Sequence, residues 1–445
     1  MKLTRRRAIQ IGAATTAGIG LGGCSSLLSQ ANSSPGRVVP ERAESRILNR
    51  VAFGPSATDL QRVTDDGTAA YIAMQLKPLQ SSGLLDFGGY DLNLKLKLRH
   101  LDVLEVDAAE LRDLPEQEVL RQLQQAAILT ATYSPYQLRE RMVDFWTNHF
   151  NIYARKGLTS FRLPVDQANV IRRHALGTFP DLLKASARST AMLVYLDNQL
   201  NVSGGPNENY ARELMELHSM GVNGGYTQKD VQEVARCFTG WSMETRFLRP
   251  RGRFWFDESR HDSGEKKVLG QTIPAGGGVK DGERVLEIIA NHPSTANFIS
   301  TKLCRYFLGE PSDGVISDVA SVYASTKGDL SAMLGVILTP QRLMENPAIV
   351  KRPFDYLVSA LRLSGADTDG AKPLQEWLDA MGQPLYQWPM PDGYPDHTAA
   401  WTGSLLARWN FGLALCSGSI QGTQLGDIKT NDLLDRICAP AFMWR

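Results

Sequence analysis

The sequence has little of several features that would assign a chain of this length to a class. It contains five cysteines in 445 residues, and none stands in a Cys-x-x-Cys pair, which excludes the common zinc and thiol–disulfide motifs. Neither charge dominates, since 48 basic side chains face 47 acidic ones. A nucleic-acid-binding protein usually carries a marked positive excess, so we do not expect nucleic acid as a partner.

Long apolar runs and catalytic signatures are also missing. No uninterrupted apolar run of about 20 residues follows the N-terminus, which excludes a polytopic membrane protein. We find no repeat of fixed period, no Gly-x-Ser-x-Gly elbow, no Walker loop and no His-Glu-x-x-His zinc motif. The composition, 43% hydrophobic and 21% charged, is typical of a globular protein rather than a disordered one.

The first residues predict an export signal. The arginines Arg5 to Arg7 precede a mildly apolar stretch that ends in Leu-Gly-Gly and is followed by Cys24. This order is typical of a secretory signal, and the consecutive arginines suit the twin-arginine route. Leu-Gly-Gly-Cys resembles the bacterial lipoprotein processing site. We therefore predict a signal over 1–23, a lipid on Cys24, and a location in the cell envelope.

Removal of this signal changes the charge balance of the chain. The signal holds four of the 48 basic side chains and no acid, so 44 basic and 47 acidic side chains remain. The Ser- and Pro-rich segment 24–44 is predicted to be a flexible tether between the membrane and a folded domain over 45–445.

The domain is patterned for helices. From about residue 44, apolar residues recur at three- and four-residue spacing, which predicts a mainly α, multi-helical single large domain. Ser134-Pro135 is expected to start one helix, and Thr227 with Asp230 to start another through a weak capping box. Further helices are predicted over 207–221, 294–308, 329–339, 353–363 and 403–416.

Strand signals are confined to a small excursion near 250–275. Residues 253–256 and 267–269 are predicted to flank a polar turn as a β-hairpin. The surrounding segment 245–282 is rich in Gly, Arg and Pro. It is either a sub-domain boundary or a long functional loop.

The densest polar constellation covers 195–226. Asn207, Glu208 and Asn209 crowd around a glycine turn at a helix start, and such oxygen-rich loops can bind a hard cation. The spacing of a calcium loop is absent, however, and the same residue types are common at turns and helix caps for local reasons. In the following helix, Arg212 stands four residues before Glu216, so an ion-pair network is the simpler explanation.

Three residues suggest a metal site if the fold brings them together. Glu213 and His218 lie on different faces of one helix, so they cannot share an ion without help from other segments. His149 lies on the inward stripe of another helix, where a lone histidine is more often a core residue than a ligand. A divalent-metal or catalytic site requires His149 to meet Glu213 or His218 in space.

Two loops also carry functional groups. Arg260, His261 and Asp262 could supply anion-binding and proton-transfer groups, or form a solvated hairpin tip. Asp392 lies in the Pro-rich segment 386–397, which is either a lid packed on the helices or an aromatic surface for sugar rings or a peptide. The cysteines Cys237, Cys304, Cys416 and Cys438 lie beside apolar residues and are predicted to be buried free thiols, although three disulfide pairings remain open.

Seven segments, in this order, resemble the bacterial family known as domain of unknown function 1800. They are residues 138–150, 206–218, 224–231, 239–241, 260–266, 351–354 and 391–396. The resemblance implies one mainly helical, exported unit, often with a twin-arginine signal, and supplies no activity. Members are often encoded beside exported proteins similar to sulfatases and alkaline phosphatases, so the resemblance implies a partner of that kind.

Two functions follow from these observations. The favoured one is a lipid-anchored binding or assembly protein that holds a partner protein or polymer at the cell envelope. The alternative is an exported hydrolase in which His149, Glu213 and His218 hold a metal, and His261 with Asp262 transfers protons. Its binding residues would be Asn207, Glu208, Asn209, Arg212, Arg260 and Asp392. Whether two carboxylates and a histidine converge within about 5 Å in a concave pocket decides between the two functions.

Overall fold

The computed structural model describes residues 43–77, 92–104, 110–245, 252–426 and 430–445. Over these residues the chain is mainly helical, with two-stranded antiparallel sheets, which confirms the predicted fold class. The predicted signal over 1–23, Cys24 and the tether up to residue 42 lie outside the described residues. Among the described helices, none has both the length and the apolar character needed to cross a bilayer.

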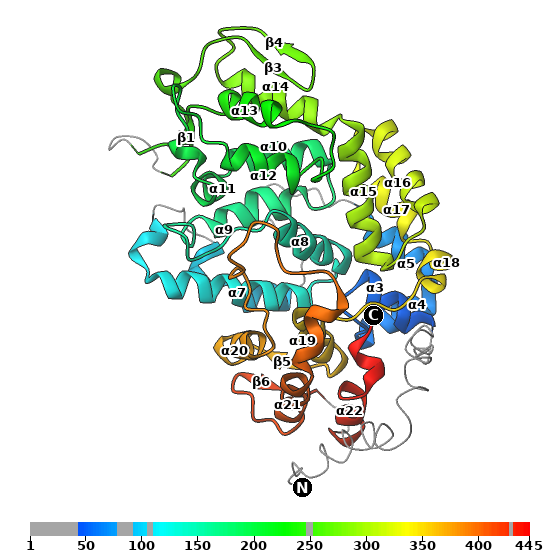
Figure 1. The fold of residues 1–445 in the computed structure, drawn as a ribbon. Coiled ribbons are helices and arrows are strands. Elements are labelled where there is room, and N and C mark those ends of the chain that lie inside the picture. The colour runs from blue at the N-terminus through cyan, green and yellow to red at the C-terminus, as the bar shows by residue number, and fades with distance from the viewer. Residues whose placement is uncertain (1–42, 78–91, 105–109, 246–251, 427–429) are drawn as a thin grey trace, which may run out of the picture.

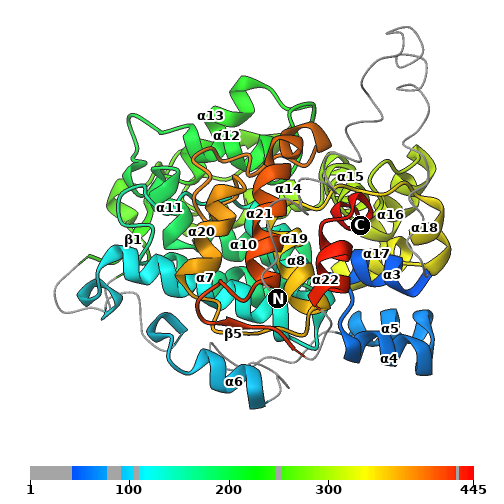
Figure 2. The same ribbon diagram turned by 90° about the horizontal axis from the view of Figure 1, so that it is seen from below.

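The first helices of the chain pack against α7 and α8. Helix α3 contacts α18 (Pro340–Glu345) from the second half of the chain, and Figure 2 shows them side by side. Helices α7 and α8 lie across the middle of the molecule (Figure 1). The elements of this part are α3 (Ala43–Val51), α4 (Ala57–Asp66), α5 (Thr68–Gln75), α6 (Leu92–Leu98), η1 (Asp102–Leu104), η2 (Glu110–Asp113), α7 (Glu116–Tyr133) and α8 (Gln137–His149).

Helix α8 begins later than its sequence suggests. Ser134 is the C-cap of α7 rather than the N-cap of α8, and the first residue of α8 is Gln137. The physical reason is the proline, which disfavours helical backbone at the residue before it and so ends α7 at Tyr133. Ten of the thirteen residues of α8 are buried, including Arg139, Glu140 and Arg141. These charged groups must therefore find partners inside the protein.

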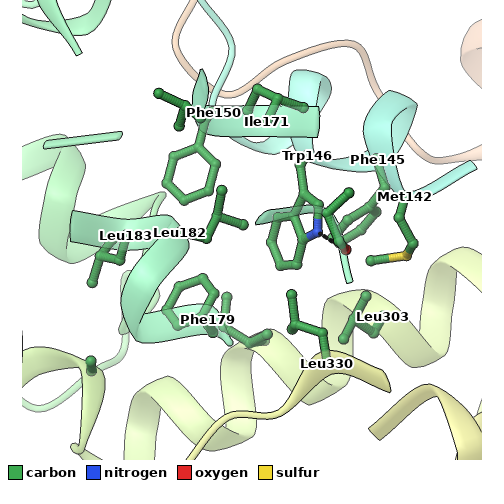
Figure 3. Close-up of a cluster of buried hydrophobic side chains, with 14 of the residues drawn as sticks. Met142, Phe145, Trp146, Phe150, Ile171, Phe179, Leu182, Leu183, Leu303 and Leu330 are labelled. Carbon is green, nitrogen blue, oxygen red and sulfur yellow. Dashed lines mark hydrogen bonds between the residues drawn. The ribbon is translucent and has the colours of Figure 1, made fainter. Parts of the chain in front are cut away.

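The apolar face of α8 forms the main core. Met142, Phe145 and Trp146 pack with Phe179 and Leu303, as Figure 3 shows. Trp146 is fully buried, and its indole Nε1 donates a hydrogen bond to the Ala175 carbonyl oxygen at 3.2 Å. Burial of a large aromatic side chain with a satisfied N–H is among the stronger contributions to a core.

The middle of the chain covers one side of α8. Thr227 and Asp230 form the predicted capping box at the start of α13. The elements of this part are α9 (Leu163–Asp166), the π-helical turn η3 (Gln167–Arg172), α10 (Phe179–Arg188), α11 (Thr190–Tyr195), η4 (Asn198–Leu200), α12 (Asn209–Glu216) and α13 (Gln228–Cys237). Helix α12 is shorter than the predicted 207–221.

The strands of the next segment pair differently from the prediction. Strand β2 (Phe254–Phe256) pairs with β1 (Trp241–Met243), and β3 (Lys266–Val268) pairs with β4 (Gln271–Ile273), so the predicted hairpin between 253–256 and 267–269 is wrong. Leu269 and Gly270 have φ of 50° and 77° and form a tight two-residue turn. A strand closed by so short a turn pairs with its immediate neighbour in the chain.

The described residues of 245–282 pack into the main core. Val268 and Ile273 belong to the same apolar cluster as the core residues of α8, and so does Trp241 just before this segment. The segment also holds η5 (Glu258–Arg260) and the start of α14 (Val279–Ala290), whose inner face packs on the same cluster.

The last part of the chain completes the main apolar cluster with α15, α16 and α17 and builds a second cluster around α19. Helix α15 ends at Leu308 with Gly309 as its C-cap, and α19 ends at Leu363, as predicted. Helices α17 and α21 lie within the ranges predicted for them. The elements are α15 (Pro293–Leu308), α16 (Asp313–Thr326), α17 (Leu330–Ile337), α19 (Pro353–Leu363), β5 (Asp367–Thr368), α20 (Lys372–Ala380), η6 (Thr398–Ser404), α21 (Leu405–Cys416), β6 (Thr423–Gln424), α22 (Thr430–Ile437) and η7 (Pro440–Met443).

The four cysteines of the described domain are free and buried, which confirms the thiol prediction. They are Cys237, Cys304, Cys416 and Cys438. Burial raises the pKa of the Cys237 thiol to about 12, so that thiol is protonated and unreactive at neutral pH.

The core around Trp146 should dominate stability. We expect Trp146→Ala to lower the free energy of unfolding by about 3–5 kcal/mol, because it leaves a large cavity and an unpaired Ala175 carbonyl. Leu406→Ala is the control, since Leu406 is 67% exposed and its truncation should change the value by less than about 0.5 kcal/mol. Urea unfolding followed by circular dichroism measures both. Equal losses in the two variants would contradict this assignment of the core.

Candidate functional site

The segment between α20 and α21 folds back across the centre of the molecule (Figure 1, orange). Asn148 of α8 forms two hydrogen bonds with Tyr394 of this segment. The Asn148 side-chain Nδ2 donates to the Tyr394 carbonyl at 3.0 Å, and the Tyr394 backbone N–H donates to Asn148 Oδ1 at 2.8 Å. Asn151 donates to the carbonyls of Trp388 and Met390 at 2.9 and 2.7 Å. The segment is therefore a packed lid on α8, one of the two structures that the sequence left open.

Gly393 is required for this docking. Its φ is 77°, and a Cβ at this position would lie 2.2 Å from the Asn148 carbonyl oxygen. Only glycine adopts such a backbone conformation at low cost and leaves room for the approach. The closeness of the two backbones explains the Asp-Gly-Tyr sequence at 392–394.

The docked segment closes one wall of a cavity of about 540 Å³. Helices α8 and α15 and the strand-like residues 349–352 form the other walls. The cavity combines aromatic rings with several cationic side chains. Its lining includes Phe145, Asn148, His149, Lys302, Arg305, Tyr306, Arg352, Trp388, Asp392, Tyr394, Asp396, His397 and Arg445.

Arg352, which lines the cavity just before α19, forms an ion pair with Asp144 of α8. The Arg352 guanidinium donates to Asp144 Oδ2, and the Tyr306 hydroxyl lies 3.1 Å from the same oxygen. Burial alone would lower the pKa of Arg352, but the neighbouring Asp144 carboxylate raises it above its usual value. Arg352 is therefore charged at any physiological pH.

A second ion pair lies directly behind the first. Arg141 donates to Asp355 Oδ1, and Arg445 Nε lies 3.4 Å from Asp355 Oδ2. Burial alone would raise the pKa of Asp355, but Arg141 and Arg445 hold it well below its usual range. The Tyr306 ring lies between the guanidinium groups of Arg141, Arg445 and Arg352, at 4.9, 4.6 and 5.7 Å from its centroid.

The cations of this cluster outnumber its carboxylates. Within the described chain, Arg141 Nη2, Arg445 Nη1 and Lys351 Nζ are buried without a hydrogen-bond acceptor. Lys351 lies over the Phe442 ring, 3.9 Å from its centroid, and burial lowers its pKa to about 7. Burial also lowers the pKa of Lys302 on the cavity wall to about 8. Three arginines, Arg141, Arg352 and Arg445, therefore share two carboxylates in this cluster. Asp396 and Asp392 partly offset the effect of burial on the pKa of Lys302.

Two of the three predicted metal ligands meet, without the third. His149 Nε2 lies 3.0 Å from the His218 carbonyl oxygen, and both rings are buried among aromatic side chains. Burial lowers the pKa of His149 well below its usual value and that of His218 to about 3, so both are neutral. No group of three or more His, Cys, Asp or Glu within the described ranges could hold a metal ion, so His149, Glu213 and His218 do not assemble one here.

The backbone at the end of α12 explains why Glu213 does not join the two histidines. The His218 backbone N–H donates to the Glu213 carbonyl in a widened last turn, which places the imidazole in the core, whereas the Glu213 side chain is only half-buried. Burial, the neighbouring Glu216 and Asp392 raise the pKa of Glu213. Glu213 therefore lies in the electrostatic field of the lid rather than with the histidines.

His261 and Asp262 are not at a solvated tip. His261 is buried, with Nδ1 2.8 Å from the Thr239 carbonyl and Nε2 3.1 Å from Asp281 Oδ2. Asp262 accepts from Arg236 Nε and Nη2 at 2.8 and 3.0 Å. Both predicted proton-transfer groups thus fasten their loop to α13 and α14.

The other predicted binding residues mostly stabilise the loop 195–209. Asn207 Oδ1 accepts from the Asn209 N–H at 2.9 Å, and Asn209 Nδ2 donates to the Leu196 carbonyl. Glu208 pairs with Arg212 at 3.0 Å, and Arg260 donates to the Gln199 carbonyl. Only Asp392 of this set lines the cavity, where it accepts from the Trp388 indole at 2.9 Å.

Several cavity residues were not predicted from the sequence. Asn148 and Arg352 stand inside two of the segments that carry the family resemblance, 138–150 and 351–354, so their motifs were a usable signal. Lys302, Tyr306 and Arg445 stand in no such segment.

A family model matches most of the chain. The chain matches the family model described as protein of unknown function (DUF1800) over residues 46–443. Neither the comparison with curated proteins nor that with solved structures gives a match.

Docking of the lid should depend on Gly393. We expect Gly393→Ala to destabilise the protein by about 1–3 kcal/mol, because the methyl group meets the Asn148 carbonyl at an unfavourable φ. Limited proteolysis should then cut the segment 386–397 faster. Gly403→Ala is the matched control, since nothing lies within 4 Å of its Cβ position. Unchanged proteolysis and melting temperature in Gly393→Ala would contradict the docking.

Proposed function

We propose that this chain, which belongs to the family of proteins of unknown function DUF1800, is an exported, lipid-anchored binding protein of the cell envelope. In this role it holds a partner protein or polymer at the membrane surface. Three features of the sequence support export and lipid anchoring: Arg5–Arg7, the apolar stretch, and the Leu-Gly-Gly-Cys site that ends at Cys24. The binding role is supported by the cavity beneath the lid.

The single observation that carries the binding role is that this cavity is preformed. Asn148 and Asn151 hold the lid through four hydrogen bonds, so its aromatic side chains are positioned before any ligand arrives. The ring centroids of Trp388 and Tyr394 lie 5.0 Å apart, and both residues line the cavity. Rigid aromatic groups in a concave site lose little conformational entropy on binding, which favours recognition of a ring or a peptide.

The nature of the partner follows only from the family resemblance. Members of the family are often encoded beside exported proteins similar to sulfatases and alkaline phosphatases. We therefore propose such a protein as the first partner to test, with an envelope polymer as the other. This part of the proposal rests on association.

An exported hydrolase is the second candidate, because Glu213 and Asp392, from different segments, lie close enough to interact electrostatically. The raised pKa of Glu213, caused first by burial and then by Glu216 and Asp392, suits a proton donor. Asp392 is exposed and would act as the base. Incubation of an envelope fraction with the protein would release a soluble product in this case, and Glu213→Gln would abolish the release.

The anchor is tested with the full chain in a bacterial host. We expect Cys24→Ala to abolish incorporation of a radiolabelled fatty acid and to move the protein from the membrane fraction to the aqueous one. Cys237→Ala is the control, since that thiol is buried in the domain. A fatty-acid label that persists in Cys24→Ala would contradict the anchor.

Binding is tested by co-sedimentation of the purified full chain with envelope polymer and by titration with the purified partner. We expect Trp388→Ala to weaken whichever interaction is present at least tenfold, because it removes the aromatic wall of the cavity. Leu406→Ala, at an exposed position of α21 outside the cavity, should bind like the unmodified chain. Binding that is equal in both variants would place the interaction elsewhere.

A further inference from the structure

The cavity is lined by several positively charged side chains, which the binding role alone does not require. Lys302, Arg305, Arg352 and Arg445 reach it from two different parts of the chain and from the C-terminal segment. Two exposed carboxylates, Asp392 and Asp396, stand on the lid side of the same cavity. Among the described residues, neither Lys302 nor Arg305 has a carboxylate within ion-pairing distance.

Arg445 shows that the excess is built into the site. Its backbone N–H and carbonyl both bond to Ile349, at 2.7 and 2.8 Å, which fixes the residue against the strand-like segment. The side chain is 4% exposed, yet its Nη1 has no acceptor among the described residues. A buried guanidinium with an unmade hydrogen bond is costly, and Arg445 lines the cavity, so an anion held there would lower the electrostatic part of that cost.

The arrangement of the cations indicates the kind of anion. Asp144 pairs with Arg352 through Nη2, and Asp355 pairs with Arg141 and with Arg445 through Nε. Arg352 and Arg445 have further N–H groups, and both line the cavity together with Lys302 and Arg305. A single arginine can bind a carboxylate in one plane. A phosphate group presents three oxygens to donors that approach from different sides, and its charge approaches two.

We propose that the cavity binds a phosphate group through Lys302, Arg445 and Arg352. Trp388 and Tyr394 would contact whatever carries that group. This assignment names the ligand class of the site and rests on the proposed function. The phosphate comes either free or as an ester on an envelope saccharide.

The test is calorimetric titration of the purified full chain in detergent with inorganic phosphate, at constant ionic strength set by chloride. We expect saturable one-site binding that Lys302→Met weakens at least tenfold. Lys302 has no ion pair within the described part of the chain, so its replacement should leave the fold intact, unlike Arg445→Gln. Arg284→Gln, on an exposed position of α14, is the charge-matched control and should bind phosphate like the unmodified chain.

Two further titrations identify the source. Tighter binding of glucose 6-phosphate than of inorganic phosphate would support an ester, and equal binding would support the free ion. Acetate or glucuronate binding in place of phosphate would overturn the proposal, and so would phosphate binding that Lys302→Met leaves unchanged. Phosphate binding is measured separately from the envelope and partner binding tested with Trp388→Ala. Failure of one proposal therefore does not imply failure of the other.

Discussion

The buried ion pair between Arg141 and Asp355 is the constraint on which much of this structure depends. Both side chains are almost completely removed from water, and removal of two charges from water costs several kcal/mol for each unless partners are close. The pair joins α8 to α19, which stand more than two hundred residues apart in the sequence. Arg445 and the Tyr306 ring complete its surroundings, so α15 and the last residues of the chain must also be in place. The two apolar clusters meet at this point.

The same network connects stability to the candidate site. Asp144 and Asp355 do not supply enough negative charge for Arg141, Lys351, Arg352 and Arg445, and two of these cations, Arg352 and Arg445, line the cavity. Folded proteins tolerate such local imbalance mainly where a ligand corrects it, because an unpaired buried charge lowers stability without other benefit. The histidines His149 and His218 add no charge to this region, because burial keeps both of them neutral in the core beside the cavity.

The helices could be predicted because their signals are local. The capping box at Thr227, the glycine after α15 and the apolar periodicity of α19 each depend on residues within a few turns of one another. The predictions that were wrong concern partners rather than elements. Strands β2 and β3 exist where the composition placed them, but each pairs with a neighbour chosen by turn geometry. Ser134 caps the end of α7 rather than the start of α8, because Pro135 disfavours helical backbone at the residue before it.

The sequence by itself therefore determined the helical class, the ends of several helices, the buried thiols, and the segments of the family resemblance in which Asn148, Arg352 and Asp392 stand. Only the tertiary structure decided what those motifs do. It placed His261 and Asp262 in structural hydrogen bonds, separated Glu213 from His149 and His218, and brought Lys302, Arg352 and Arg445 to one cavity. The physical reason is that periodicity and capping act over a few residues, whereas the cavity joins segments separated by tens to hundreds of residues, whose meeting depends on how the whole core packs.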